Sequence, residues 1–374
     1  FRHIPSSFYE VAAISNRNVF WNICLPLARP AIVAGLALVC MEVVSDFGTV
    51  EFFSLETLTL GIFNVWIGMN NITAAAQIST FTFIFIILLL LTEMYSRSRK
   101  RFNDTSRKQT VAKPKIVTGF KAVLLYVVCL TPVIFGFVTP AAILLWNVVK
   151  SADMAAFLAV ADVLKNSLFI ATLGAGLIMG SAILVASAAK FNSGKIIQVV
   201  GILSATGYAF PGTMLAIGVL VFLGFVDRGI NAVSWGFGNL HLSGTILALL
   251  FAYLVRFQAV GYGSVASGLT KIPPNLISCS RSLGMTSHST MRRITIPLIR
   301  NSIIAGGVLA FVDIMKELPM TLLLRPFDFE TLATYSYQFA HDELMDQASL
   351  PALMIVVVGL IPVVFLNKLL RAYD

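Results

Sequence analysis

The sequence predicts an all-α protein that crosses a lipid bilayer about eight times. Only 12% of the 374 residues are charged, 57% are hydrophobic, and the mean hydropathy is +0.85. A soluble domain usually carries about 25% charged residues, so lipid must be the solvent for most of this chain. The apolar residues form continuous runs of about 20, the length of a spanning helix, whereas the strands of a membrane barrel would alternate.

Eight apolar stretches have the length of a spanning helix. In chain order they are approximately residues 30–50, 74–93, 122–146, 166–189, 196–224, 242–262, 302–320 and 350–369. The pair Pro211-Gly212 inside the fifth stretch predicts a kink or a break in that helix. Small residues in the fourth stretch predict close helix packing: Gly174, Gly176, Gly180 and Ser181.

The basic residues predict which loops face the cytoplasm. Nine Lys and Arg lie in residues 94–121 and five in 263–301; with the two ends and the turn at 190–195, 21 of 27 fall on one side of an eight-span arrangement. Positive charge marks the cytoplasmic side, so both termini are expected there. Because these residues lie between apolar runs and form no single patch, the net charge of +9 does not indicate a nucleic-acid partner.

An internal repeat divides the chain. Residues 4–30 match residues 272–301, and further positions align in pairs: Glu42 with Asp313, Asp46 with Glu317, and Thr57 with Thr331. We therefore expect two equivalent halves, at 1–95 and 121–374, joined by a basic cytoplasmic linker at 96–120. The first half holds two spans and the second six, so the first half is expected to be N-terminally truncated by about four spans.

The repeated segment, at about 263–301 in the second copy, is expected to form two short helices along the cytoplasmic face. Gly284 allows a turn with positive φ, and Thr286 or Ser287 can cap a new helix after it. Pro273 and Pro297 lie at element starts, where a missing N–H costs little. Helix, glycine turn, helix is the predicted order.

This segment resembles the "EAA" loop of ABC-importer permeases, which reads Glu-Ala-Ala, three residues, Gly, and then Ile/Leu-Pro. Gly284 and Pro297 fit that spacing, and the first copy keeps Glu10, Ala12 and Ala13. With the flanking Asp46-Phe-Gly-Thr-Val and Lys316-Glu-Leu-Pro, essentially the whole chain resembles the fused two-domain, ferric-iron type of binding-protein-dependent transport permease. Two departures are that Asn16 stands at the glycine position, with three residues fewer before Pro26, and that Ser278-Cys279-Ser280 replaces Glu-Ala-Ala.

The resemblance implies a permease subunit of an ABC importer in the bacterial inner membrane, with the type I permease fold. Its expected partners are a cytoplasmic ATPase dimer, which would hold ATP and Mg, and a periplasmic substrate-binding protein; the chain itself is expected to have no catalytic residue, cofactor or metal. The implied ATPase-coupling residues are Glu10, Ala12, Ala13, Asn16, Pro26, Ser280, Gly284, Met285 and Pro297.

Charged residues at the ends of two spans form a second candidate site. A charge within the bilayer is costly, so such residues are paired or functional. They are expected to line the transport path or to form ion pairs: Glu42, Asp46, Asp313, Lys316 and Glu317. Arg256 is instead expected to extend its side chain toward the cytoplasmic interface.

Ferric iron is the expected cargo, with thiamine or a phosphonate as alternatives. Two other hypotheses differ in class: an ion-coupled secondary transporter and a non-functional truncated remnant. A secondary transporter would be built from inverted repeats, whereas both copies of the repeat here run in the same direction.

Overall fold

The computed structural model describes residues 18–98, 117–151, 153–191, 194–233 and 241–371. These residues form helices and connecting turns and, within the described ranges, no strand. The all-α prediction is therefore confirmed. Two compact units can be distinguished, one made of residues 1–44 and 80–140 and the other of residues 45–79 and 141–374.

The first unit contains the π-helical turn η1 (Phe20–Cys24), most of α2 (Leu25–Ser45), the later part of α5 (Ile72–Ser98), α6 (Phe120–Val133) and η3 (Ile134–Val138). Helical conformation runs without interruption from η1 into α2, because the Leu25 N–H donates to the Phe20 carbonyl. Asn18 precedes this helix, and its side-chain oxygen accepts from the Phe20 N–H at 3.1 Å.

The second unit contains the remaining helices. In chain order they are α3 (Gly48–Phe52), α4 (Leu58–Phe63), η2 (Asn64–Gly68), α7 (Thr139–Lys150), α8 (Met154–Phe191), α9 (Lys195–Ser204), η4 (Gly207–Ala209), α10 (Gly212–Val233), α11 (Ile246–Thr270), α12 (Pro274–Ser282), α13 (Ser287–Thr290), η5 (Met291–Thr295), α14 (Ile296–Leu298), α15 (Arg300–Met315), α16 (Pro319–Leu324), α17 (Leu332–His341) and α18 (Met345–Arg371).

Helices form in all eight predicted stretches, but their lengths differ from the prediction. Among the described residues, six helices are long and apolar enough to span a bilayer, or seven if the bent pair Ser287–Leu298 and Arg300–Met315 counts as one span. The count of eight stays a prediction. The fifth stretch breaks at Pro211-Gly212, as predicted, because α9 and η4 end before this pair and α10 begins at Gly212. The seventh ends early, since α15 stops at Met315 and α16 begins at Pro319.

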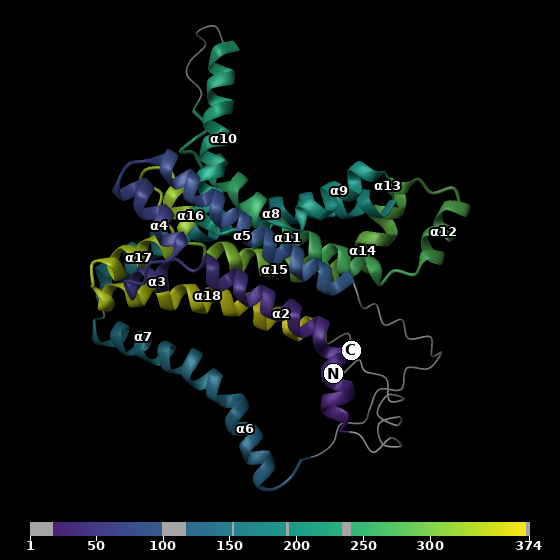
Figure 1. Cartoon of the computed structure of the whole chain (residues 1–374), viewed down its shortest axis with the longest axis horizontal. Coiled ribbons are helices and arrows are strands. Elements are labelled where there is room, and N and C mark those ends of the chain that lie inside the picture. Colours follow the sequence, from purple (N-terminus) through teal and green to yellow (C-terminus); the bar gives the residue numbers. More distant parts are fainter. Residues whose placement is uncertain (1–17, 99–116, 152, 192–193, 234–240, 372–374) are drawn as a thin grey trace. The chain divides into compact units, whose positions relative to one another are not determined.

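Helices α8, α11 and α15 pack side by side and form the core of the second unit (Figure 1). Gly174 on α8 and Gly261 on α11 allow the close approach, since a Cβ on either would lie 2.8 Å from an isoleucine side chain of the neighbouring helix. Ser181 also makes a contact, donating to Gln258 Oε1 at 2.7 Å. The packing prediction was wrong for Gly176 and Gly180, since a Cβ on either would have no neighbouring side chain within 4 Å.

The internal repeat is visible in the order of the described elements. Helices α2, α3, α4 and α5 and helices α15, α16, α17 and α18 follow the same order, in which two short helices lie between two long ones. Thr57 caps α4 and Thr331 caps α17 in the same way, each accepting from the backbone N–H three residues on. The described non-glycine residues with positive φ also fall in equivalent turns: Ser54 with Asp328, and Asn70 with Glu343. The boundaries of the two halves stay a prediction.

Gly207 provides a test of the packing of η4 against α11. A Cβ at Gly207 would lie 2.0 Å from the Val255 carbonyl oxygen, which belongs to the backbone of a buried helix and cannot move aside easily. We expect Gly207→Ala to destabilise the folded protein by about 3 kcal/mol, the upper end for overpacking. Thermal unfolding in detergent measures this change.

Gly218→Ala is the matched control, since it lies on α10 with no atom within 4 Å of the added methyl group. Alanine is the better helix former by about 1 kcal/mol, so this variant should melt at the same temperature or slightly higher. Equal melting of the two variants would contradict the described approach of η4 to α11.

Candidate functional site

The segment that is predicted to couple to an ATPase, here called the coupling segment, runs from α12 to α14, at the opposite end of α11 and α15 from α16 and α17 (Figure 1). Helix α12 ends at a turn in which Gly284 has φ +76°. The Met285 N–H closes this turn by donating to the Ser280 carbonyl at 3.1 Å. Thr286 then caps α13, accepting from the Ser289 N–H at 3.3 Å. The predicted order of helix, glycine turn and helix is therefore present, and Thr286, not Ser287, is the cap.

A hydrogen bond between two side chains links the short helices α12 and α13. Ser280 on α12 and Thr290 on α13 are both buried, and their hydroxyl oxygens lie 2.7 Å apart. The tip of the segment faces outward, because Leu283 is 82% exposed. The same segment also carries exposed basic side chains: Arg281, His288, Arg292 and Arg293. The surface thus combines an apolar projection with positive charge.

Proline creates the same local structure in both copies. A π-helical turn precedes Pro26 (Phe20–Cys24) and another precedes Pro297 (Met291–Thr295). Because proline has no N–H and its ring clashes with the carbonyl four residues earlier, a wider turn relieves the helix there. After Pro297 the chain bends by 73° into α15. Of the other first-copy residues, Glu10, Ala12, Ala13 and Asn16 lie outside the described residues.

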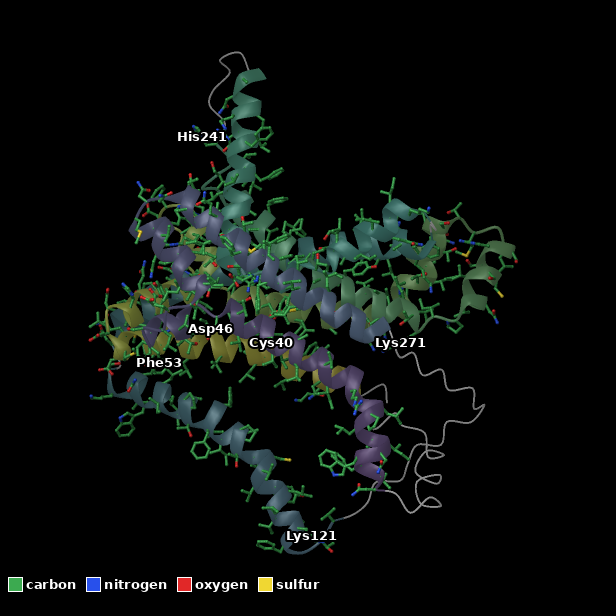
Figure 2. All side chains as sticks on the ribbon, viewed as in Figure 1. Cys40, Asp46, Phe53, Lys121, His241 and Lys271 are labelled. Atoms are coloured by element: carbon green, nitrogen blue, oxygen red, sulfur yellow. The ribbon has the colours of Figure 1, made fainter. Side chains whose placement is uncertain are left out.

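Asp46 and Glu317 lie at equivalent positions of the repeat, and each carboxylate caps the start of a short helix. The Asp46 carboxylate accepts from the Thr49 N–H at 3.3 Å at the start of α3, and the Glu317 carboxylate accepts from the Met320 N–H at 3.0 Å at the start of α16. A carboxylate is favourable at these positions because helix N-termini carry unpaired N–H groups and partial positive charge. Figure 2 labels Asp46 where α2 ends.

The other candidate acids differ from this pair. Asp313 and Lys316 form an ion pair at 3.2 Å within α15, so the pair expected for Lys316 is local. Glu42 lies on an exposed face of α2. That these residues line a transport path stays a prediction.

Glu317 forms a buried ion pair with Arg256 of α11. The Arg256 Nη1 atom donates to Glu317 Oε1 at 3.0 Å, and the two side chains are 8% and 6% exposed. The expectation that Arg256 extends to the membrane interface was therefore wrong. A buried guanidinium is stable only when it is paired, and the partner acid lies 61 residues further along the chain.

Small and polar residues complete the surroundings of the pair. A Cβ on Gly212 of α10 would lie 2.2 Å from Arg256 Nη1 and 2.7 Å from Glu317 Oε1, so only glycine fits. One helical turn from Arg256, the Tyr253 and Thr321 hydroxyl oxygens lie 2.5 Å apart and are fully buried. The pair and these neighbours join α10, α11 and α16.

We expect Glu317→Gln to destabilise the protein by about 3–5 kcal/mol, because it leaves the Arg256 guanidinium buried and without a countercharge. The amide keeps an acceptor for the Met320 N–H, so the variant tests the charge separately from the cap. Thermal unfolding in detergent measures the change. Asp162→Asn is the control, since its ion pair with Lys165 is exposed and should contribute little. Similar small losses in both variants would show that the buried pair does not stabilise the fold.

Comparison with known proteins places this geometry in a family. The model of the family "Binding-protein-dependent transport system inner membrane component" matches residues 1–103 and 174–372, together most of the chain. One curated relative, the Fe(3+)-transport system permease protein FbpB 2 of Haemophilus influenzae, is 27% identical over 386 residues, which cover 98% of this chain and 72% of that protein. PhnV of Salmonella typhimurium, named for 2-aminoethylphosphonate transport, is 23% identical over 150 residues, 40% of this chain and 52% of that one.

Solved structures show the same fold. A bacterial ABC transporter involved in the import of the acidic polysaccharide alginate matches with a TM-score of 0.55 and 19% identity, over 67% of this chain and 96% of the other. A second structure of the alginate transporter, in complex with an alginate pentasaccharide-bound periplasmic protein, matches with a TM-score of 0.55 and 18% identity, over 68% of this chain and 96% of the other. The chain has the fold of an ABC importer permease, and it belongs to the family of binding-protein-dependent transport system inner membrane components.

Proposed function

We propose that this chain is the permease of an ATP-driven importer of ferric iron. A cytoplasmic ATPase dimer would hold ATP and Mg and supply the energy, and a periplasmic binding protein would deliver the cargo. The single observation that carries the coupling role is the segment from α12 to α13, which turns at Gly284 and presents exposed Leu283 among basic side chains. This is the shape of an apolar projection that enters a groove on a partner.

The connection between this segment and the membrane helices supports the proposal. Helix α15 begins after the 73° bend and ends beside Glu317, which is tied to Arg256 of α11. Force applied at α13 therefore reaches α15 and, through the ion pair, α11. We propose that Ser280, Gly284, Met285 and Pro297 set the angle of the segment, and that Pro26 with Glu10, Ala12, Ala13 and Asn16 serves the first copy.

The choice of cargo rests on the extent of similarity to the relatives. The iron-transport relative aligns over 98% of this chain and the phosphonate-transport relative over 40%, so ferric iron is the first candidate and a phosphonate the second. We further propose that Asp46, Asp313, Lys316 and Glu317 stabilise the fold and do not bind cargo, because caps and ion pairs occupy them. Both termini are proposed to be cytoplasmic, from the positions of Lys and Arg.

Gly284→Val should abolish uptake of radioactive ferric iron by cells that carry the complete importer, while the variant still inserts into the membrane. The left-handed φ of +76° is open to glycine but strongly disfavoured for a β-branched residue, so the turn between α12 and α13 would be lost. Membrane insertion is measured by immunoblot of the membrane fraction.

Gly284→Asn is the matched control. It adds a side chain of similar size, but asparagine tolerates the left-handed conformation, so a substantial part of the uptake should remain. Normal uptake by the valine variant would remove the coupling role of this turn. Loss of uptake in both variants, with insertion intact, would indicate that the added side chain blocks docking and that the backbone conformation is not the cause.

A further inference from the structure

A cavity lined by both polar and apolar residues lies between the turn after α3 and the end of α17, at the other end of the second unit from the coupling segment. Its volume is about 260 Å³, and its chemically active lining residues are Glu51, Ser54, Tyr337, His341 and Glu343. Figure 2 labels Phe53 in the α3 turn and Lys271 at the start of the coupling segment, at opposite ends of the second unit. If the coupling segment is cytoplasmic, this cavity lies at the outer end of the second unit.

Three groups that can act as metal ligands lie close together in this cavity: the Glu51 carboxylate, the Tyr337 phenol and the His341 imidazole. The Tyr337 hydroxyl donates to Glu51 Oε1 at 2.8 Å, and His341 Nδ1 lies 3.8 Å from the same oxygen. The rings of Tyr337 and His341 stack with their centroids 5.7 Å apart, so both face the carboxylate. The second oxygen, Glu51 Oε2, is buried and has no hydrogen-bond partner. A carboxylate held in this way has an unused acceptor beside a phenol and an imidazole.

Packed aromatic rings hold the Tyr337 side chain in place. The Phe47 ring is 2% exposed and packs against Tyr337 at 5.9 Å and Phe63 at 4.7 Å between centroids. Burial and the hydrogen bond to Glu51 both raise the pKa of the Tyr337 phenol, so in the empty cavity the proton stays on Tyr337. His341 stands at the rim with its side chain 61% exposed. Tyr337 is thus held in place by the packed aromatic rings, whereas His341 is open to solvent.

The internal repeat indicates that these donors are not required by packing. The positions equivalent to Glu51, Tyr337 and His341 in the opposite copies are Leu322, Phe63 and Ile67, and all three are apolar. Apolar side chains therefore serve at the related place in the same fold. The polar set occurs at one of the two places only, with one donor from the first copy and two from the second.

The spacing of the donors suits a metal cation. Metal–ligand bonds of about 2.0–2.2 Å place two ligands at right angles about 3 Å apart. The Tyr337 and Glu51 oxygens already have this separation, and His341 Nδ1, on an exposed side chain, lies 3.8 Å from the same Glu51 oxygen. Carboxylate and imidazole are iron ligands, and a tyrosine oxygen binds iron in haem enzymes. Among the described residues no group of three His, Cys, Asp or Glu could hold a metal, so the tyrosine oxygen is essential to this set.

We propose that Glu51, Tyr337 and His341 form a contact site for a hard, high-valent metal cation as cargo, on the side of the permease where cargo enters. The identity of the cation as ferric iron rests on the proposed function. On binding, the cation takes the place of the phenol proton, which leaves to water, and the two oxygens and the imidazole nitrogen become its ligands. The remaining positions are free for water or for groups of a delivering protein.

Binding is tested on the full chain in lipid nanodiscs with ferric citrate as the probe. The wild-type protein should retain iron in equilibrium dialysis and show the visible charge-transfer absorption of an iron-bound tyrosinate. Tyr337→Phe should lose the absorption, and Glu51→Gln should bind iron at least about tenfold more weakly, as is usual when a metal site loses an essential group. Absence of the absorption in the wild type, or its persistence in Tyr337→Phe, would overturn the proposal.

Tyr335→Phe is the matched control, since Tyr335 lies on the same helix and lines a different cavity; it should bind iron as the wild type does. Tyr337→Phe keeps the ring that packs on Phe47, so it should melt near the wild-type temperature. If either Tyr337→Phe or Glu51→Gln fails to fold, His341→Gln replaces it, because that side chain is exposed and contributes little to folding. Unchanged iron binding by a folded His341→Gln variant would then count against the site.

Uptake by the complete importer separates this inference from the proposed function. If the wild type imports ferric iron and Tyr337→Phe and Glu51→Gln import it equally well, the cargo site is wrong and the iron importer stands. If the wild type binds iron in nanodiscs through Tyr337 but no ferric iron enters cells, the proposed cargo of the importer is wrong and the metal site stands. Reduced uptake in both variants, with Tyr335→Phe unaffected, is the expected result.

Discussion

The buried ion pair between Arg256 and Glu317 ties the end of α15 and the start of α16 to α11 in the second unit. Moving two charges out of water is costly, and their attraction offsets that cost only when the geometry is close. Here the distance is 3.0 Å, and Gly212 leaves room for both groups. The same Glu317 carboxylate accepts from the Met320 N–H and so fixes the start of α16. One acid thereby caps the start of α16 and pairs with the buried cation of α11.

The repeat explains why this acid stands where it does. Asp46 caps α3 as Glu317 caps α16, so the primary task of an acid at this position is local. In the second copy the carboxylate at this position also pairs with the buried Arg256. A similar divergence is seen at the cavity between α3 and α17, where Glu51 and Tyr337 meet although their counterparts are apolar. The two copies thus share the order of their helices but differ in polar interactions at single places.

The features that sequence reasoning predicted are those fixed by local backbone chemistry. Proline and glycine act within a few residues, so the break at Pro211-Gly212 and the left-handed turn at Gly284 could be located. The apolar runs predicted the positions of the long helices, because the thickness of the bilayer sets the length of a spanning helix. The predictions that were wrong are those that depend on how each helix is rotated about its axis. Gly176 and Gly180 turn away from neighbouring side chains, whereas Gly174 faces one. The pairing of Arg256 with Glu317 could have been found by asking which cation satisfies a buried acid. The contact between Glu51 and Tyr337 could not, because the two residues are 286 positions apart and only the fold brings them together.

The packing of α15 determines how a movement of the coupling segment would spread. A 16-residue helix is about 24 Å long, and the adjacent Gly306 and Gly307 could allow it to bend. Gly306, however, is pressed against α11, since a Cβ there would lie 2.7 Å from Ser264. Close-packed interiors transmit displacement and do not absorb it. A tilt imposed at the bend after Pro297 would therefore move α15 together with α11 and α8, and the far end of that group carries Glu317 and α16. In the proposed mechanism the start of α16 would therefore move with the coupling segment, because α15 and α11 carry the displacement to Glu317.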